Sequence, residues 1–179
     1  GADVVKFQTA VPELVMIRDA EKAQYQMDKT DVGETQLEMV KKIHLPLESY
    51  EKLKAECEKR EIEFMSTAFD DVSIETLKKL DLKRYKIPSG EITNLPYLRH
   101  IGRIGKPVIM STGMSTLEEV RTALNILFDA GAQKNEMTIL HCNTEYPTPM
   151  TDVNLRAMTT IRDTFGVKVG YSDHTLGIE

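Results

Sequence analysis

The sequence has few cysteines, no excess of positive charge and no long apolar run. Its formal net charge is −5, which argues against nucleic acid as the main partner, because phosphate backbones are bound by clustered Lys and Arg. Cys57 and Cys142 lie far apart without CxxC spacing, so we expect free thiols in a reducing compartment. No apolar run approaches the roughly 20 residues that span a bilayer, and we expect a cytoplasmic protein without a membrane partner.

Two common phosphate-binding glycine loops are also absent. Neither GxGxxG nor GxxxxGK[ST] follows an expected strand, which weakens a nucleotide-binding interpretation. The 179 residues are 41% hydrophobic and 28% charged, which is typical of a soluble globular domain. The sequence begins with GADVVKFQ, which resembles the end of a helix-to-strand turn, so we expect a fragment of a longer protein.

What the sequence does contain is a regular alternation of β-rich and helical segments. The segment starts at 62, 84, 107, 138 and 167 are 22 to 31 residues apart, the length of a β/α unit. Such alternation predicts a parallel sheet, either open and doubly wound or most of an eight-stranded barrel. The expected strands are 4–9, 62–67, 84–89, 107–112, 138–143 and 167–174.

The helical patterns lie between these strands. In residues 116–131 we expect an apolar stripe that includes Leu117, a capping box of Ser115 and Glu118, and a helix end at Gly131. Further helices are expected in 48–60 and 153–166. The polar, aperiodic residues 10–46 predict instead a long, mobile loop.

Polar side chains end nearly every expected strand, and such ends converge at the carboxyl-terminal face of a β/α barrel, where active sites are built. Strand alternation places Lys6 and Gln8 on one face, and Ser172 and His174 also share a face. A buried lysine is costly unless a carboxylate or an anion pairs with it. Lys6 and Lys86 therefore predict an anionic ligand in this acidic protein.

Several motifs, taken together and in order, resemble the bacterial sialic acid (N-acetylneuraminate) synthases and their relatives that make legionaminic and pseudaminic acids. The motifs are VKFQT, FMSTAFD, YKIPSGEITNLP, KPVIMSTGMSTLEEV, LHCNTEYPTPMTDVNLRAM and VGYSDHTLGIE. The HCNTEYP form is closer to the sialic and legionaminic branches than to the pseudaminic branch.

This resemblance implies an α/β fold, a (β/α)8 TIM barrel of which residues 1–179 hold about six strands. It also implies a first strand, a last strand with a second metal-binding histidine, and a carboxyl-terminal antifreeze-like domain outside this sequence. The implied reaction condenses phosphoenolpyruvate with N-acetylmannosamine or a 2,4-diacetamido analogue and releases phosphate, in a homodimer.

The resemblance also assigns roles to residues. Glu91 would be the catalytic carboxylate, and Lys6 and Lys86 would position the departing phosphate. His174 would be one of two histidines that bind a divalent metal, Mn²⁺ or alternatively Mg²⁺. Phosphoenolpyruvate would contact the two lysines and the hydroxyls of Thr67, Ser89, Ser111 and Ser172, and the amino sugar would contact Gln8 and Tyr146. A further phosphate contact stays open between Asn143 and Thr144.

Other interpretations remain open at this point. The protein could be another phosphoenolpyruvate-using 3-deoxy sugar-acid synthase, an aldolase of the same fold, or a non-catalytic anion- or sugar-binding relative. Taken singly, Lys86 could form an ion pair with Glu91 or Glu63, and Glu91 could cap a turn. His141 could point inward in a hydrogen-bonded role or contact a ligand.

Overall fold

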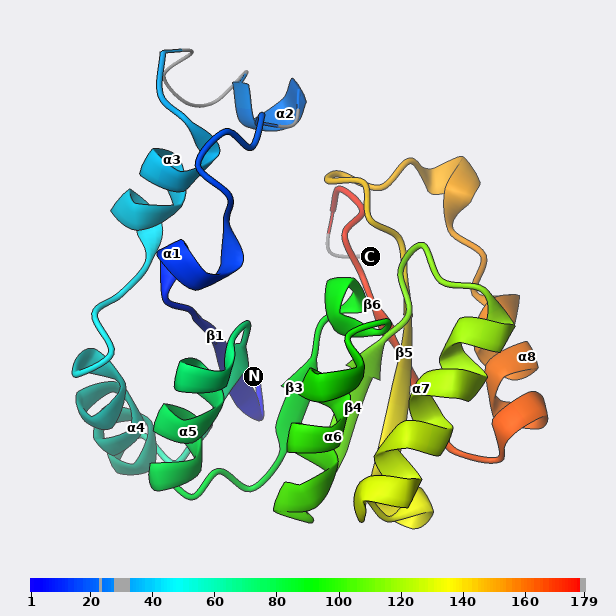
Figure 1. Cartoon of the computed structure of the whole chain (residues 1–179). Coiled ribbons are helices and arrows are strands. Elements are labelled where there is room, and N and C mark those ends of the chain that lie inside the picture. Colours follow the sequence, from blue (N-terminus) through cyan, green and yellow to red (C-terminus); the bar gives the residue numbers. More distant parts are fainter. Residues whose placement is uncertain (23, 28–32, 178–179) are drawn as a thin grey trace. The chain divides into compact units, whose positions relative to one another are not determined.

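The computed structural model describes residues 1–22, 24–27 and 33–177. The chain divides into two compact units, Gly1–Leu82 and Lys83–Glu179. In both units strands alternate with helices, and each expected strand overlaps an observed one (Figure 1). The α/β class and the six strands expected from the sequence are therefore confirmed.

The first unit is built on two parallel strands. β1 (Val4–Thr9) pairs with β2 (Glu63–Ala68), with Gln8 opposite Thr67. The helices α4 (Ser49–Lys59) and α5 (Asp71–Lys79) pack against β2. Tyr50 of α4 and Ile74 of α5 are fully buried, so an aromatic and a branched aliphatic side chain anchor the two helices in the core of this unit.

The prediction of a loop throughout residues 10–46 was wrong. The described residues of this region form three short helices: α1 (Pro12–Val15), α2 (Gln24–Met27) and α3 (Gln36–Ile43). Thr35 and Glu38 form a capping box at the start of α3, so local capping starts this helix without a long apolar stripe. Part of the predicted loop, residues 23 and 28–32, lies outside the described residues.

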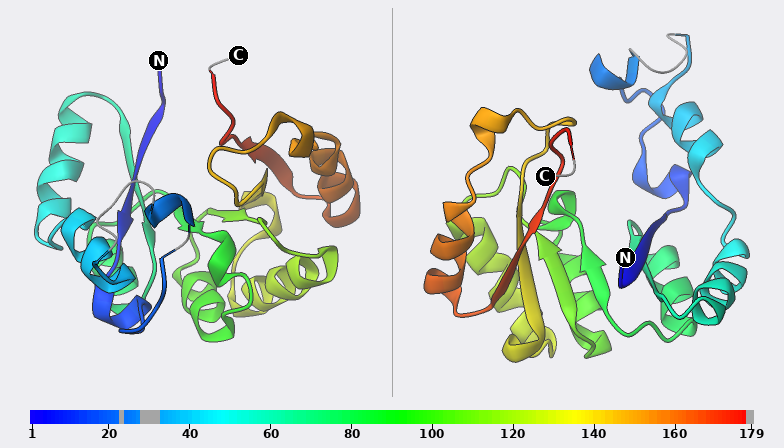
Figure 2. Two further views of the ribbon diagram at one scale, coloured as in Figure 1. Left: turned by 90° about the horizontal axis from the view of Figure 1, so that it is seen from above. Right: turned by 180° about the vertical axis from the view of Figure 1, so that it is seen from behind.

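The second unit is a four-stranded parallel sheet in chain order. Its strands are β3 (Tyr85–Ile87), β4 (Val108–Ser111), β5 (Met137–Cys142) and β6 (Lys168–Ser172). The crossovers contain α6 (Leu95–Ile104), α7 (Leu117–Ala130) and α8 (Arg156–Phe165), and three short 3₁₀ turns cover Ser89–Glu91, Lys134–Glu136 and Met150–Asp152. Because neighbouring strands are joined by crossovers of one hand, these helices lie on one face of the sheet (Figure 2).

The capping box of α7 is one residue later than expected. The pattern S/T-x-x-E occurs twice in overlapping register, and the structure uses Thr116 with Glu119 in place of Ser115 with Glu118. The Ser115 hydroxyl donates instead to the Gly113 carbonyl, at 3.3 Å. Leu117, the first residue of α7, is 43% exposed, so it does not belong to the buried stripe that the sequence predicted.

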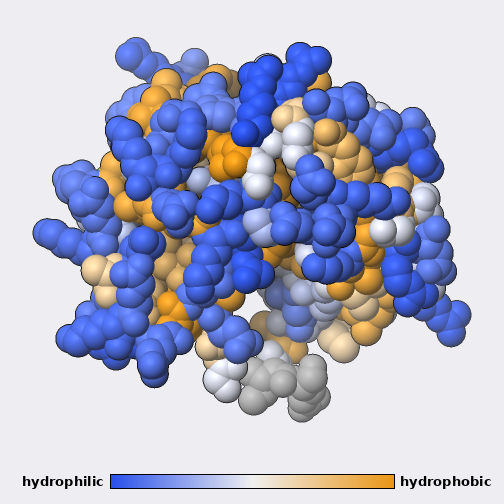
Figure 3. Space-filling view, turned by 90° about the horizontal axis from the view of Figure 1, so that it is seen from below, coloured by the Kyte–Doolittle hydropathy of each residue, from blue (hydrophilic) through white to orange (hydrophobic). Residues whose placement is uncertain are grey.

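Both cysteines are free, which confirms the expectation of no disulfide. Within residues 1–22, 24–27 and 33–177, no helix combines the length and the apolar character needed to cross a membrane. Figure 3 views the molecule from below, and most of the surface seen there is hydrophilic.

Candidate active site

The second unit buries a cation beside hydroxyl groups at the ends of its strands. Lys86 of β3 is only 8% exposed, and its ammonium donates to the Ser111 hydroxyl at 2.6 Å and to the Ile87 carbonyl at 2.8 Å. Ser111, at the end of β4, is 6% exposed. Because the Ser111 oxygen accepts from Lys86, the hydroxyl keeps its own proton for another acceptor. The pair therefore offers one positive charge and at least one further donor to an anion.

Ser89 lies in the turn after β3, and a backbone N–H from the loop after β4 holds its side chain in place. Its hydroxyl oxygen accepts a hydrogen bond from the Gly113 backbone N–H at 2.8 Å. The same oxygen is 3.5 Å from the sulfur of Cys142, the last residue of β5. The ends of three neighbouring strands thus meet around one hydroxyl, as the polar strand ends of the sequence led us to expect.

A second group of predicted residues lies at the end of β6. Ser172 and His174 share a face as predicted, since the Ser172 hydroxyl is 3.2 Å from His174 Nε2. The Tyr146 ring packs edge-on against the imidazole, with ring centroids 4.5 Å apart. The Thr148 N–H donates to the His174 carbonyl at 2.8 Å, which joins the loop after β5 to the loop after β6.

Glu91 ends the 3₁₀ turn that follows β3 and is half-buried. The Asn94 side-chain amide donates to one carboxylate oxygen of Glu91 at 2.7 Å, while Asn94 itself caps α6. This contact orients the carboxylate, and no signal in the sequence pointed to Asn94.

The two candidates for the additional phosphate contact have different surroundings. The Asn143 amide donates to the Asp152 carbonyl at 3.2 Å, and Asn143 Oδ1 is buried without a hydrogen-bond partner among the described residues. The Thr144 methyl group instead lies against Gly113, beside Ser89 and Cys142. The arrangement favours Thr144 as the side chain nearer to Ser89, and the phosphate contact itself stays a prediction.

The first unit carries the remaining predicted residues. Lys6 and Gln8 are exposed on one face of β1, as the alternation predicted, while Thr67 on β2 is 2% exposed. Partial desolvation lowers the pKa of the Lys6 ammonium, and within the described residues no hydrogen bond or ion pair of this group is found. The Tyr50 hydroxyl donates to the Gln8 carbonyl, so α4 fixes the backbone of β1 beside Lys6 and Gln8.

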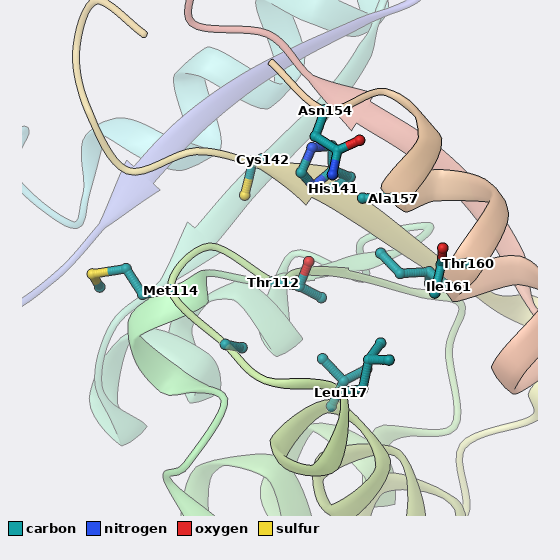
Figure 4. A pocket seen from close by; sticks show the side chains of 11 residues that line it. Thr112, Met114, Leu117, His141, Cys142, Asn154, Ala157, Thr160 and Ile161 are labelled. Atoms are coloured by element: carbon teal, nitrogen blue, oxygen red, sulfur yellow. The ribbon is translucent and has the colours of Figure 1, made fainter. Parts of the chain in front are cut away.

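A separate cavity of about 370 Å³ lies on the helix side of β5 (Figure 4). His141 lines it together with Leu117 of α7 and Ile161 of α8. His141 therefore faces the helices, and its Nε2 atom is buried without a hydrogen-bond partner in the part of the chain that the structure describes. Burial lowers the pKa of His141, which favours the neutral imidazole.

Metal binding was predicted for His174. Among the described residues, no group of three or more His, Cys, Asp and Glu side chains is placed to hold a metal ion. The half-buried His174 imidazole is a suitable single ligand for a divalent ion, and the adjacent Asp173 carboxylate already accepts from the N–H and the hydroxyl of Thr175. The described part of the chain therefore presents one predicted ligand and not a closed metal site.

Comparison with known proteins gives consistent matches over the whole chain. The model of the NeuB family matches residues 1–179. The N,N'-diacetyllegionaminic acid synthase of Campylobacter jejuni is 49% identical over 178 residues, and the enzyme of that name from Legionella pneumophila is 46% identical over 180. These alignments cover 99% of this chain but 53% and 51% of the two relatives, so the chain spans about half of their length.

A solved structure shows the same fold. The N-acetylneuraminic acid (sialic acid) synthetase of Leptospira borgpetersenii, crystallised with citrate, matches with a TM-score of 0.82 at 28% identity. The match covers 99% of this chain and 56% of that one. It bears out the expected fold class, an incomplete β/α barrel.

Proposed function

Because this chain belongs to the NeuB family along its whole length, we propose that the protein condenses phosphoenolpyruvate with an N-acetylated hexose to form a nonulosonic acid. The observation that carries the proposal is the buried Lys86 ammonium, which donates to the Ser111 hydroxyl at the end of β4. The Ser89 hydroxyl in the turn after β3 is held by the Gly113 N–H two residues after the same strand end. Phosphate and carboxylate together carry roughly three negative charges, and such an anion needs lysine charge and hydroxyl donors.

The sugar substrate is proposed from the relatives. The two N,N'-diacetyllegionaminic acid synthases are 49% and 46% identical to this chain, whereas the pseudaminic acid synthase of Helicobacter pylori is 32% identical. A product with two N-acetyl groups requires an acceptor sugar that carries both. We therefore expect a 2,4-diacetamido hexose to be used better than N-acetylmannosamine.

In the proposed reaction, C3 of phosphoenolpyruvate forms a bond to the aldehyde carbon of the open-chain sugar. Water attacks C2, and the C–O bond to phosphate breaks. Lys86 and Lys6 would position the phosphate and stabilise its departure. Glu91, oriented by Asn94, would transfer a proton to or from the attacking water or a sugar hydroxyl.

Three finer features belong to the same proposal. His174 would contribute one imidazole to a divalent metal, Mn²⁺ or Mg²⁺, which when bound acts as a Lewis acid toward the aldehyde oxygen. The full-length protein would act as a homodimer. It would work in the cytoplasm, where phosphoenolpyruvate and the amino sugar are available and both thiols stay reduced.

The test is phosphate release by the full-length gene product with phosphoenolpyruvate and a panel of sugars. The panel contains N-acetylmannosamine and its 2,4-diacetamido analogues, each with Mn²⁺, with Mg²⁺ and with a chelator. We expect release only when sugar and metal are both present, in proportion to nonulosonic acid formed. Binding of phosphoenolpyruvate without turnover on any sugar would favour a non-catalytic relative, and turnover only on a non-acetylated sugar would favour a different synthase.

Glu91→Gln tests the catalytic carboxylate. We expect kcat to fall by about 10²-fold or more, because general acid–base groups contribute on this scale, while the Kd for phosphoenolpyruvate changes by less than about threefold. Glu136→Gln serves as a matched control, since Glu136 is an exposed carboxylate in the turn before β5. A Glu91→Gln protein with the rate of the control would remove Glu91 from this role.

A further inference from the structure

The backbone of Gly113 makes a direct contact with a predicted ligand of the substrate. Gly113 is buried two residues after β4, and its N–H donates to the Ser89 hydroxyl oxygen at 2.8 Å. A hydroxyl has one proton to donate and two lone pairs to accept with. The Gly113 amide occupies one lone pair, which constrains the directions that the Ser89 proton can take.

The same position has no room for a side chain. A Cβ atom on Gly113 would lie 2.5 Å from the Thr144 methyl carbon, 3.0 Å from the Ser89 hydroxyl oxygen and 3.4 Å from the Cys142 sulfur. The shortest of these separations is below any normal carbon–carbon contact, so an alanine here would displace one of its neighbours. The glycine is therefore required by close approach of the loops after β3, β4 and β5.

The Cys142 thiol completes the surroundings of the hydroxyl. Its sulfur is 3.5 Å from the Ser89 oxygen, a distance at which sulfur is a weak hydrogen-bond acceptor or donor. Replacing this weak hydrogen bond by one to another group costs little free energy. Whichever of the two groups donates in this contact, the Ser89 proton can turn to a phosphate or carboxylate oxygen when an anion binds, while the oxygen stays fixed by Gly113.

We propose that Gly113 is a positioning residue, whose backbone N–H and lack of a side chain aim the Ser89 hydroxyl at phosphoenolpyruvate. The inference rests on the proposed function, since Ser89 is assigned to phosphoenolpyruvate there. It predicts that substitution of Gly113 weakens the use of phosphoenolpyruvate selectively and leaves recognition of the sugar unchanged.

The main experiment measures steady-state kinetics of Gly113→Ala in the full-length gene product. We expect the KM for phosphoenolpyruvate to rise by about 10-fold or more, because the added methyl group overpacks the site and displaces the Ser89 hydroxyl from its oriented hydrogen bond with the residue 113 N–H. The KM for the amino sugar should change by less than about twofold. Equal increases in both KM values would overturn the positioning role.

Gly102→Ala is the matched control for overpacking. Its added Cβ would lie 2.6 Å from the Ala130 Cβ and 2.8 Å from the Leu127 carbonyl oxygen, at the contact of α6 with α7. We expect Gly102→Ala to lower Tm without changing the KM for phosphoenolpyruvate. If Gly113→Ala lowers Tm in the same way and likewise leaves that KM unchanged, the residue has only a packing role.

Two double variants locate the effect on Ser89. Thr144→Ser removes the methyl carbon that a new Cβ would strike, so Gly113→Ala/Thr144→Ser should recover part of the lost phosphoenolpyruvate affinity relative to Gly113→Ala. In a Ser89→Ala background, Gly113→Ala should raise the KM for phosphoenolpyruvate by less than about threefold, because coupled residues give non-additive effects. A full additional increase in that background would overturn the proposed link.

The failure of this inference is distinguishable from failure of the proposed function. If the wild-type protein neither binds phosphoenolpyruvate by calorimetry nor releases phosphate, the function is wrong and the inference falls with it. If the wild-type protein does both and Gly113→Ala matches it in phosphoenolpyruvate affinity, only the positioning role is wrong.

Discussion

Replacement of Ser111 by alanine tests whether the Lys86 ammonium depends on a hydroxyl. Lys86 and Ser111 are 8% and 6% exposed, and the donor–acceptor distance between them is 2.6 Å. A hydrogen bond to a charged group contributes about 1.5–3 kcal/mol, and water has little access to replace the lost acceptor. We therefore expect Ser111→Ala to reduce the free energy of unfolding by about 1.5–3 kcal/mol, measured by urea denaturation of the full-length gene product at constant m-value.

The adjacent residue supplies a control of similar burial. The Thr112 hydroxyl donates to the Leu140 carbonyl at 3.0 Å, a bond between neutral groups, and the same carbonyl also accepts from the Thr112 N–H at 3.1 Å. Thr112→Val keeps the shape and leaves that carbonyl satisfied, so the loss should be about 0.5–1.5 kcal/mol. Ser111→Ala should also raise the Kd for phosphoenolpyruvate about 10-fold, and Thr112→Val should not. If Ser111→Ala destabilises the protein no more than Thr112→Val, the hydrogen bond from the Lys86 ammonium to Ser111 adds nothing to stability beyond a neutral hydrogen bond.

Two further predictions concern carboxylates that accept hydrogen bonds at the starts of α5 and α7. Asp70 accepts hydrogen bonds from the Ser73 N–H and hydroxyl at the start of α5 and from the Val11 N–H, so Asp70→Ala should cost about 2 kcal/mol in urea denaturation, and an unchanged midpoint would contradict this. Glu119 accepts from the Thr116 N–H and hydroxyl, which lowers the pKa of its carboxyl below the ordinary value of 4.5. Its stabilisation is therefore present above pH 4.5 and lost as pH falls through the lower folded pKa, so the stability difference between wild type and Glu119→Gln should vanish in acid. A difference independent of pH would refute this assignment.

The sequence was sufficient to predict where the strands lie and which side chains share a strand face, because both depend on local periodicity. Alternation alone predicted that Lys6 and Gln8 share a face, and the structure confirms it. The helices in residues 10–46 were missed because α3 is started by the Thr35–Glu38 capping box and buries only Met39 and Val40, which is too little for a periodic apolar signal.

Contacts between loops were beyond what the sequence could provide. Gly113 ends the tripeptide Ser-Thr-Gly at residues 111–113. The neighbouring sequence does not show that its N–H donates to the hydroxyl of a residue 24 positions earlier. Asn94 was not singled out in the sequence either, and its contact with Glu91 depends on how the 3₁₀ turn folds back to the start of α6. The inward, hydrogen-bonded role allowed for His141 was wrong, because His141 faces the cavity beside α7 and α8 and its Nε2 atom has no hydrogen-bond partner among the described residues.

The end of β4 has a larger part in the site than any motif suggested. Ser111 accepts from the Lys86 ammonium, and Gly113, two residues later, donates to Ser89. Lys86 of β3 and Ser89 of the turn after it are both assigned to phosphoenolpyruvate, and both are therefore held by partners at or just after the end of β4. Since both hydroxyl oxygens already accept from N–H donors, the oxygens are held in place before an anion arrives, and only their protons need to rotate on binding. A change that moves the β4 end by even a fraction of an ångström should therefore disturb Lys86 and Ser89 together, although neither residue lies on that strand.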